Sequence, residues 1–306
     1  MSEMSVEDYS PIEVSARLDA VVEQKSRRST QELLLFGMLA GIYIGFGAIA
    51  STTVLSYEGL PAAVSKWLAG SMFCVGLILV IVPGSELFTG NVLMAAGLVS
   101  RQVPLRLVLR NWLLVYLGNF VGALLLALVM YGTGLLGTAA DPNEVGQAAA
   151  KIASAKIDLA FGPALLRGVL CNILVCLAVI LAMSARTVAG KIAGIYFPIT
   201  VFVLSGFEHS IANMYFLPAG LLASGRFVGG FFSMFYNLVP VTLGNILGGL
   251  VVILLHPARA RKVAQTIGER LTGTRRAQPA APPPSEAERP GPVGSGDSGC
   301  PPRRTP

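Results

Sequence analysis

The fold is decided by two short stretches of similar sequence, GSELFTGN at residues 84–91 and GFEHSIAN at residues 206–213. Each has a glycine, a glutamate two residues later and an asparagine five residues after the glutamate, and each interrupts a long apolar segment. A glutamate at membrane depth is costly, and non-helical backbone is tolerated there only where it is buried in protein or lines a cavity. The pair therefore predicts two broken membrane helices that face one pore.

Composition places the rest of the chain in a membrane. The 306 residues are 53% hydrophobic and 13% charged, the mean hydropathy is +0.65, and soluble domains are roughly a quarter charged. The net charge of +6 could suggest nucleic-acid binding, but the basic residues lie between and after the apolar runs, as membrane topology requires. The four cysteines have neither metal-ligand spacing nor the density of a disulfide framework. We expect a polytopic membrane protein without metal or cofactor.

Six apolar runs predict an all-α membrane protein with six transmembrane helices. The second and fifth runs are too long for one helix of about 20 residues, and the two motifs divide them into broken helices 2 and 5. The polar stretch at 137–158 is expected to be the longest outer loop. The six runs are 32–55, 62–99, 111–136, 159–183, 192–222 and 235–255.

Three regions follow from this pattern. Residues 1–30 carry apolar residues at helical spacing among charges, which predicts an amphipathic helix on the cytoplasmic surface. Residues 31–258 are expected to form the six-span transmembrane channel domain. Residues 259–306 are rich in Pro, Ala, Gly, Ser and Arg, a composition that predicts a mostly disordered, basic cytoplasmic tail.

The spans fall into two related halves. Because each half has three spans, an odd number, the second half enters the membrane in the opposite orientation, which gives an inverted 3+3 repeat. Lys and Arg are concentrated in residues 1–30, 101–110 and 186–191 and after the sixth run, so both termini are expected on the cytoplasmic side. The repeat is clearest where Asn111, Leu117-Gly118-Asn119 and Gly122 recur as Asn237, Leu243-Gly244-Asn245 and Gly248.

The motifs also carry candidate chemistry. His209 follows Glu208 in the second break, and it is either a neutral imidazole that holds a helix end or a proton-exchange group; we favour proton exchange because a carboxylate lies next to it. Thr89 in the first break offers a hydroxyl to a small polar solute, or it caps a helix. Glu86 and Glu208 are expected to accept hydrogen bonds from the backbone amides that the breaks release.

Other candidates lie outside the motifs. Lys156 would place a positive charge at the outer mouth, with a solvated loop lysine as the alternative, and Asn172 would place an amide deeper in the fourth span. The apolar residues Phe73, Leu77 and Phe202 are candidates for a constriction, with lipid-facing or core positions as the alternative.

At these positions the chain resembles the formate/nitrite transporter family, over roughly residues 10–260. The resemblance rests on GSELFTGN at 84–91, RG at 167–168, CNILVCLA at 171–178, SGFEHSIANM at 205–214 and LGN at 243–245. It implies an all-α protomer of aquaporin-like architecture that is not an enzyme and that assembles as a homopentamer with one pore per protomer. It also implies a multi-pass protein of the bacterial inner membrane that passes small monovalent anions such as formate, nitrite or hydrosulfide.

The resemblance further implies roles for individual residues. The family's central histidine falls on His209, its pore threonine on Thr89, its vestibule lysine on Lys156 and its polar asparagine on Asn172. The anion would cross the constriction as its neutral acid, after a proton arrives by way of His209. The hydrophobic constrictions fall on Phe73, Leu77, Leu87, Phe88 and Phe202.

The substrate follows from a smaller feature of the second motif. Phe207 precedes Glu208, as in formate-type members, whereas nitrite-type members tend to have Tyr there. We expect formate, with nitrite or hydrosulfide as the alternative within the family. A water- or glycerol-type channel would resemble its relatives in two Asn-Pro-Ala motifs, and the sequence has no Asn-Pro dipeptide. An intramembrane enzyme would need a nucleophile or a metal set that the apolar runs do not offer.

Overall fold

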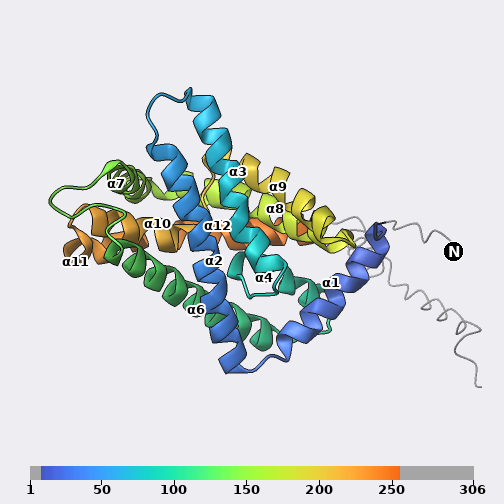
Figure 1. Ribbon diagram of the computed structural model, residues 1–306. Helices are drawn as coiled ribbons and strands as arrows, with labels where there is room; N and C mark the ends of the chain where they lie inside the picture. Colours follow the sequence, from blue (N-terminus) through green and yellow to red (C-terminus); the bar gives the residue numbers. More distant parts are fainter. Residues whose placement is uncertain (1–7, 256–306) are drawn as a thin grey trace, which may run out of the picture. The chain divides into compact units, whose positions relative to one another are not determined.

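The computed structural model describes residues 8–255, and within this range the chain is helical with no strand (Figure 1). The all-α prediction is confirmed. The predicted tail at 259–306 lies outside the described residues. The helices are α1 (Pro11–Ser26), α2 (Thr30–Ser56), α3 (Ala62–Ile81), α4 (Phe88–Asn91), η1 (Val92–Ala95), α5 (Ala96–Val99), α6 (Leu105–Gly132), α7 (Glu144–Ile157), α8 (Phe161–Ser184), α9 (Val188–Leu204), α10 (Ser210–Ala223), α11 (Phe227–Gly230), η2 (Phe231–Ser233) and α12 (Met234–Leu255).

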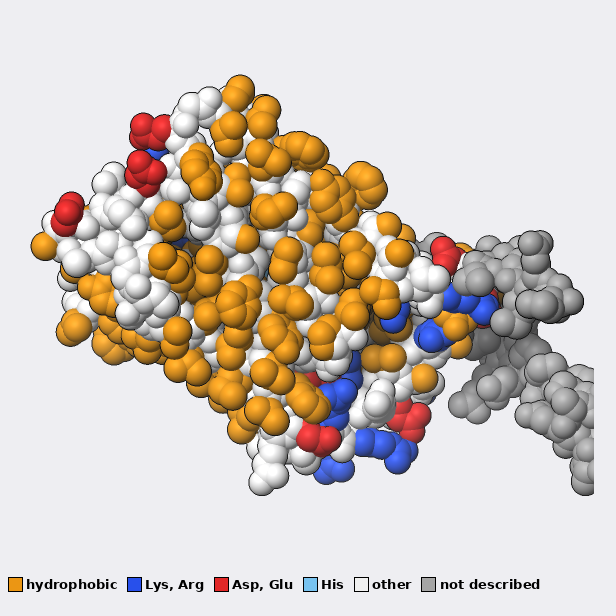
Figure 2. Space-filling model, in the orientation of Figure 1, with side chains coloured by type: hydrophobic (Ala, Val, Ile, Leu, Met, Phe, Trp, Pro, Cys, Tyr) orange, Lys and Arg blue, Asp and Glu red, His pale blue; other side chains and the backbone are white. Residues whose placement is uncertain are grey.

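The helices have the length and surface of a membrane protein. Among the described residues, five helices are long and apolar enough to cross a bilayer: α2, α3, α6, α8 and the continuous stretch Phe227–Leu255. Figure 2 shows hydrophobic side chains over most of the visible face, with Lys and Arg gathered near α1. Large apolar side chains such as Leu113 and Leu166 are more than half exposed. The chain is therefore a multi-pass membrane protein.

Glycines allow two pairs of long helices to pack closely. In the α2–α6 pair, a Cβ on Gly122 would collide with the backbone carbonyl of Met38, and in the α8–α12 pair a Cβ on Gly244 would collide with that of Leu165. Small residues let membrane helices approach until their backbones touch. These two pairs form the frame that holds the two motifs.

Each motif begins with a glycine that lies shortly after the end of a helix. Helix α3 ends at Ile81 and α4 begins at Phe88, and Gly84 between them has φ +93°. Helix α9 ends at Leu204 and α10 begins at Ser210, and Gly206 between them has φ +70°. Positive φ is readily adopted only by glycine. Each glycine therefore lets the chain leave one helix and re-enter the protein as extended backbone.

The polar stretch at 137–158 differs from the predicted loop, because most of it is the helix α7. Asn143 caps its first turn by accepting a hydrogen bond from the Gly146 amide. The helix packs on α10, where a Cβ on Gly220 would meet Ala149 and Ala153. The apolar residues of α7 recur at helical spacing, at Val145, Ala149, Ile152 and Ala153. The stretch was assigned to a loop from its polar composition, and this periodicity was overlooked.

Helix α1 and helix α7 mark opposite ends of the bundle (Figure 1). Next to α1, the Tyr9 amide donates to the Ser184 carbonyl at the end of α8 (2.8 Å), and the Tyr9 ring lies between the guanidinium groups of Arg17 and Arg186. Helix α7 follows the end of α6 and precedes the start of α8. We call these two sides the α1 end and the α7 end.

Candidate functional site

The two motifs touch each other through a threonine and a histidine. The Thr89 hydroxyl lies 2.8 Å from Nε2 of His209, although 120 residues separate them in the chain. Thr89 stands in the first turn of α4 and His209 is the N-cap residue of α10. Both side chains are buried. The two motifs therefore meet at one place.

The second ring nitrogen of His209 fixes the protonation pattern. Its Nδ1 accepts a hydrogen bond from the Ala212 amide at 3.0 Å, which caps α10. An acceptor nitrogen carries no proton, so the neutral ring holds its proton on Nε2 and donates it to Thr89. This geometry agrees with the capping alternative, and it also aims one ring proton at the partner motif. No hydrogen bond joins the Glu208 and His209 side chains among the described residues.

Glu208 instead belongs to a polar cluster at the α7 end. Nζ of Lys156 donates to both carboxylate oxygens, at 2.9 and 3.0 Å, and Nδ2 of Asn213 donates to one of them at 2.6 Å. Asn213 also donates to Asn237, which in turn donates to the Lys156 carbonyl. Lys156 lies in the last turn of α7 with its side chain 15% exposed. The solvated-loop reading of Lys156 is therefore wrong.

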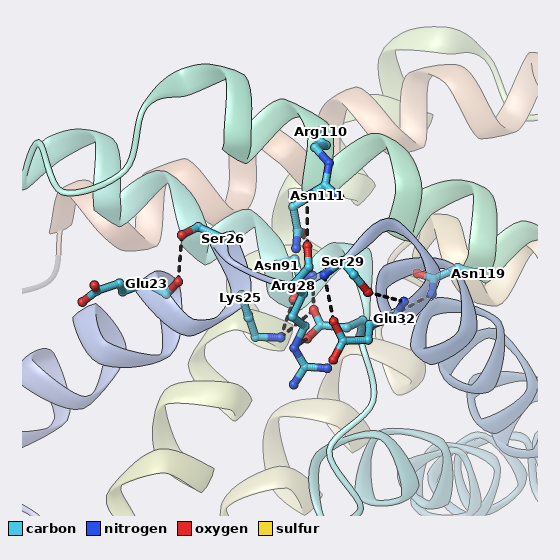
Figure 3. Close-up of polar contacts among 11 residues, drawn as sticks. Glu23, Lys25, Ser26, Arg28, Ser29, Glu32, Asn91, Arg110, Asn111 and Asn119 are labelled. Carbon is cyan, nitrogen blue, oxygen red and sulfur yellow. Dashed lines mark hydrogen bonds and ion pairs between the residues drawn. The ribbon is translucent and has the colours of Figure 1, made fainter.

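A matching polar cluster lies at the α1 end, where Figure 3 labels Lys25, Arg28, Asn91 and Asn111. Nζ of Lys25 donates to Glu86 and to Asn91, both at 2.8 Å, and Arg28 forms a second ion pair with Glu86 at 3.3 Å. Asn91 donates to Glu86 and to Asn111. Burial lowers the pKa of Lys25, while Glu86 opposes that shift. The sequence assigned Lys25 and Arg28 only to membrane topology, and their pairing with Glu86 was missed.

Two asparagines hold the extended backbone of the breaks. Asn119 accepts from the Phe88 amide (2.9 Å) and donates to the carbonyls of Gly37 and Glu86. Asn245 makes the same three contacts around the second motif, with Ser210, Gly168 and Glu208. The expectation that the glutamate side chains satisfy the released amides is therefore wrong, because both carboxylates bind cations and asparagine amides instead.

Replacing Asn119 by leucine is expected to destabilise the protein strongly. The change leaves the Phe88 amide and the Glu86 carbonyl buried without these partners, and each such loss costs about 1–3 kcal/mol. Asn245→Leu should lower the thermal unfolding midpoint of purified protein by a similar amount, because its three contacts correspond. Leu117→Ala is a control, since Leu117 is exposed on the same helix. An unchanged midpoint in both asparagine variants would contradict the clamp.

Asn172 lies beside the centre rather than at a mouth. Its Nδ2 donates to the carbonyls of Asn245 (2.6 Å) and Thr89 (3.2 Å), and its Oδ1 is buried without a hydrogen-bond partner. Among residues 8–255, no hydrogen bond joins Asn172 to Lys156. Asn172 therefore supports the backbone at Thr89, and it has one acceptor free toward the interior.

The apolar candidates separate into two groups. The rings of Phe73 and Phe202 meet edge to face at 5.4 Å, and Phe202 stacks on His209 at 5.9 Å. Phe88 instead packs against the Tyr116 ring of α6 at 4.9 Å. Lipid-facing positions are excluded for all five candidates because each is at least 96% buried: Phe73, Leu77, Leu87, Phe88 and Phe202.

A cavity at the α1 end reaches two of the apolar candidates, Leu77 and Leu87. It has a volume of about 280 Å³, and its walls include Leu77 and Leu87 together with Lys25, Arg28 and Glu86. The cavity therefore extends from a cluster that carries two cations and one carboxylate to the buried side chains of Leu77 and Leu87.

Comparisons with known proteins agree on one family. A family model described as formate/nitrite transporter matches residues 12–258. A probable formate transporter of Methanothermobacter thermautotrophicus is 39% identical over 261 residues, which cover 80% of this chain and 94% of the relative. The formate channel FocA of Escherichia coli (strain K12) is 35% identical over 247 residues, which cover 75% and 86% of the two chains.

Solved structures give the same result. An ion channel of the FNT family has a TM-score of 0.69 at 29% identity, covering 81% of this chain and 99% of that one. A pentameric formate channel with formate bound has a TM-score of 0.63 at 34% identity, covering 78% and 97%. The chain belongs to the formate/nitrite transporter family, whose members are channels and transporters and not enzymes.

Proposed function

We propose that the protein is a channel for small monovalent anions, with formate as its main substrate, and that the anion crosses the centre as its neutral acid. The observation that carries this proposal is the buried contact between Thr89 and His209, with the rings of Phe73 and Phe202 beside it. A bare anion does not enter an apolar constriction, because its desolvation cost is too large. Its neutral acid passes at a much lower cost.

The proton reaches the substrate by way of His209. Nε2–H is the ring donor that faces the other half of the protein, and Thr89 is its present acceptor. A substrate oxygen that replaces the Thr89 hydroxyl would accept the same hydrogen bond. Protonation of Nδ1 would break the cap on Ala212, so the ring does not pass through an imidazolium. The proton that Nε2 gives to the substrate is therefore replaced at Nε2 by a proton from water in the same step, which keeps the ring neutral.

The architecture that supports this function is an inverted 3+3 repeat with broken helices 2 and 5. The two polar clusters support it, because equivalent residues make equivalent contacts: Lys25, Glu86, Asn91, Asn111 and Asn119 correspond to Lys156, Glu208, Asn213, Asn237 and Asn245. Residues 31–258 then form the channel domain, 1–30 its surface helix and 259–306 its tail. The aquaporin-like arrangement follows from two half-helices that meet at the midplane.

Assembly and orientation complete the proposal. A solved relative is described as a pentameric formate channel, and we infer a homopentamer with one pore per protomer. Long exposed rows of leucine and valine on α6 and α8 provide surface for neighbouring protomers and lipid. Lys25, Arg28, Arg110 and Arg186 lie at the α1 end, so this end faces the cytoplasm, in the bacterial inner membrane.

Formate is chosen over nitrite for two reasons. The relatives described as formate transporters or channels include those from Methanothermobacter and E. coli, and Phe207 stands before Glu208. Nitrite and hydrosulfide are the alternatives, since both are small monovalent anions with neutral acids. A water- or glycerol-type channel is the alternative from another class. The ion-pair clusters at both ends do not favour this alternative, because a neutral solute has no charge for them to attract.

Formate uptake into proteoliposomes is expected to rise as the external pH falls from about 7 toward 5, because more protons are then available to neutralise the anion. Nitrite and hydrosulfide should be measured beside formate in the same vesicles. Protein-free vesicles are the control, because neutral formic acid also crosses bilayers. Equal rates for formate and glycerol, or an anion current that is independent of pH as the only activity, would contradict the proposal.

A further inference from the structure

A second cavity opens at the α7 end and is lined by two basic side chains. Its volume is about 430 Å³. Lys66 reaches it from the start of α3 and Arg167 from α8, while the chain from Val203 to Phe207, which includes the second glycine break, forms another wall. Leu55 and Ala69 complete the lining.

The cavity lies on the line that leads to the apolar constriction. Lys66 precedes Phe73 by seven residues on α3, which is two helical turns, so both side chains lie on the same face with Lys66 about 10 Å farther toward the α7 end. Ser205 and Gly206 follow directly after the end of α9, within four residues of Phe202. Phe73 and Phe202 are the two rings in contact. A solute in this cavity therefore stands just outside them.

The charges of the cavity are not neutralised. Neither Lys66 nor Arg167 forms an ion pair with any residue in the range 8–255, and both side chains are exposed. Lys156, in contrast, has its ammonium bound to both oxygens of Glu208. Arg167 lies within the apolar helix α8, where an unpaired cation is costly unless it faces water or a ligand. The cavity supplies such a place.

We propose that this cavity is an anion-binding site at the outer mouth, where Lys66 and Arg167 hold a small monocarboxylate before it is protonated. The inference rests on the proposed transport function and assigns its first binding step. A guanidinium offers two parallel N–H donors that match the two oxygens of a carboxylate, and an ammonium adds a point charge. Leu55 and Val203 provide apolar walls that exclude water from one side. Lys156 then serves the Glu208 cluster and is not the capturing charge.

The electrostatic potential in the cavity can be measured with a cysteine introduced into its lining. Ser205→Cys places one there, because Ser205 is exposed and makes no side-chain hydrogen bond that the structure describes. Cys74, Cys171 and Cys176 are buried, and Cys300→Ser removes the remaining thiol. In proteoliposomes the introduced thiol is treated from outside with an anionic sulfonatoethyl and a cationic trimethylammonioethyl methanethiosulfonate. The ratio of their rates reports the local charge.

The anionic reagent is expected to react faster, and Lys66→Gln with Arg167→Gln should lower the rate ratio by about tenfold, since two charges at several ångströms act oppositely on the two reagents. Millimolar formate should slow the anionic reagent in the parent and not in the double variant. Lys151→Gln is the matched control, because Lys151 is an exposed lysine of α7 that does not line the cavity. Its ratio should match the parent.

Three results would overturn the assignment. One is an unchanged rate ratio in the double variant. Another is a thiol that reacts in detergent but with neither reagent in the bilayer, because a lipid or a neighbouring protomer then fills the cavity. The third applies where the parent takes up formate, and it is an uptake rate at low external formate that the double variant does not lower. The thiol readout needs no transport, so absent formate uptake with a charge-dependent ratio would defeat the proposed function and leave the anion site standing.

Discussion

His209→Asn is expected to abolish pH-dependent formate uptake while leaving the protein folded and assembled. Asparagine is a good N-cap residue, so its side-chain oxygen can replace Nδ1 as acceptor for the Ala212 amide. It has no ring nitrogen to take the place of Nε2 at Thr89. The substitution therefore keeps the structural role of His209 and removes the proton relay. Stopped-flow uptake in proteoliposomes and size-exclusion chromatography measure the two properties separately.

A second variant, His209→Phe, removes both the helix cap and the ring nitrogen that faces Thr89. Losing the cap costs about 1 kcal/mol, so this variant should be less stable than His209→Asn and equally inactive. Thr89→Val tests the partner, because it removes the hydroxyl that accepts from Nε2 and keeps the shape of the side chain. If His209→Asn retained uptake with the wild-type pH dependence, the imidazole would be a helix cap alone and the relay role would be wrong.

Part of the fold and of the candidate site could be predicted from the sequence, because both depend on local sequence patterns. Apolar runs indicate membrane helices wherever lipid must surround them, and the two Gly-Glu-Asn motifs mark where the chain leaves helical geometry. The meeting of Thr89 with His209 was expected only in outline, from two breaks that face one pore. The structure gives the contact itself.

The partners of the buried charges could not be predicted, because they depend on how distant elements pack. Lys25 and Glu86 are 61 residues apart, and no local pattern distinguishes a lysine that folds back onto a carboxylate from one that only sets topology. Glu208 lies beside His209 in the chain, yet its side chain turns to Lys156 on α7. Helix α7 was missed for a different reason, because the stretch was judged by its polar composition although its apolar residues recur at helical spacing. Neighbouring positions in the sequence, such as Glu208 and His209, therefore did not indicate which side chains are in contact.

Lys156→Met is expected to destabilise the protein severely, whereas the double variant Lys156→Met with Glu208→Gln should recover most of that stability. Glu208 is 5% exposed, and removing one partner of a buried ion pair typically costs about 3–5 kcal/mol because the other charge is left unpaired. Removing both charges avoids this penalty. Glutamine can still accept from Asn213, which now donates to Glu208 at 2.6 Å. Thermal unfolding of the purified single and double variants gives the coupling.

Lys151→Met is the matched control for the loss of a lysine from α7, because Lys151 is exposed and forms no ion pair within the described chain. It should leave the unfolding midpoint unchanged. A Lys156→Met variant that is as stable as the parent, but slower and less sensitive to salt, would make Lys156 a free charge that attracts anions. A double variant that is stable and transports formate at the parent rate would instead show that this pair holds the second break in place, and that the capture of the anion is left to other cations at the mouth.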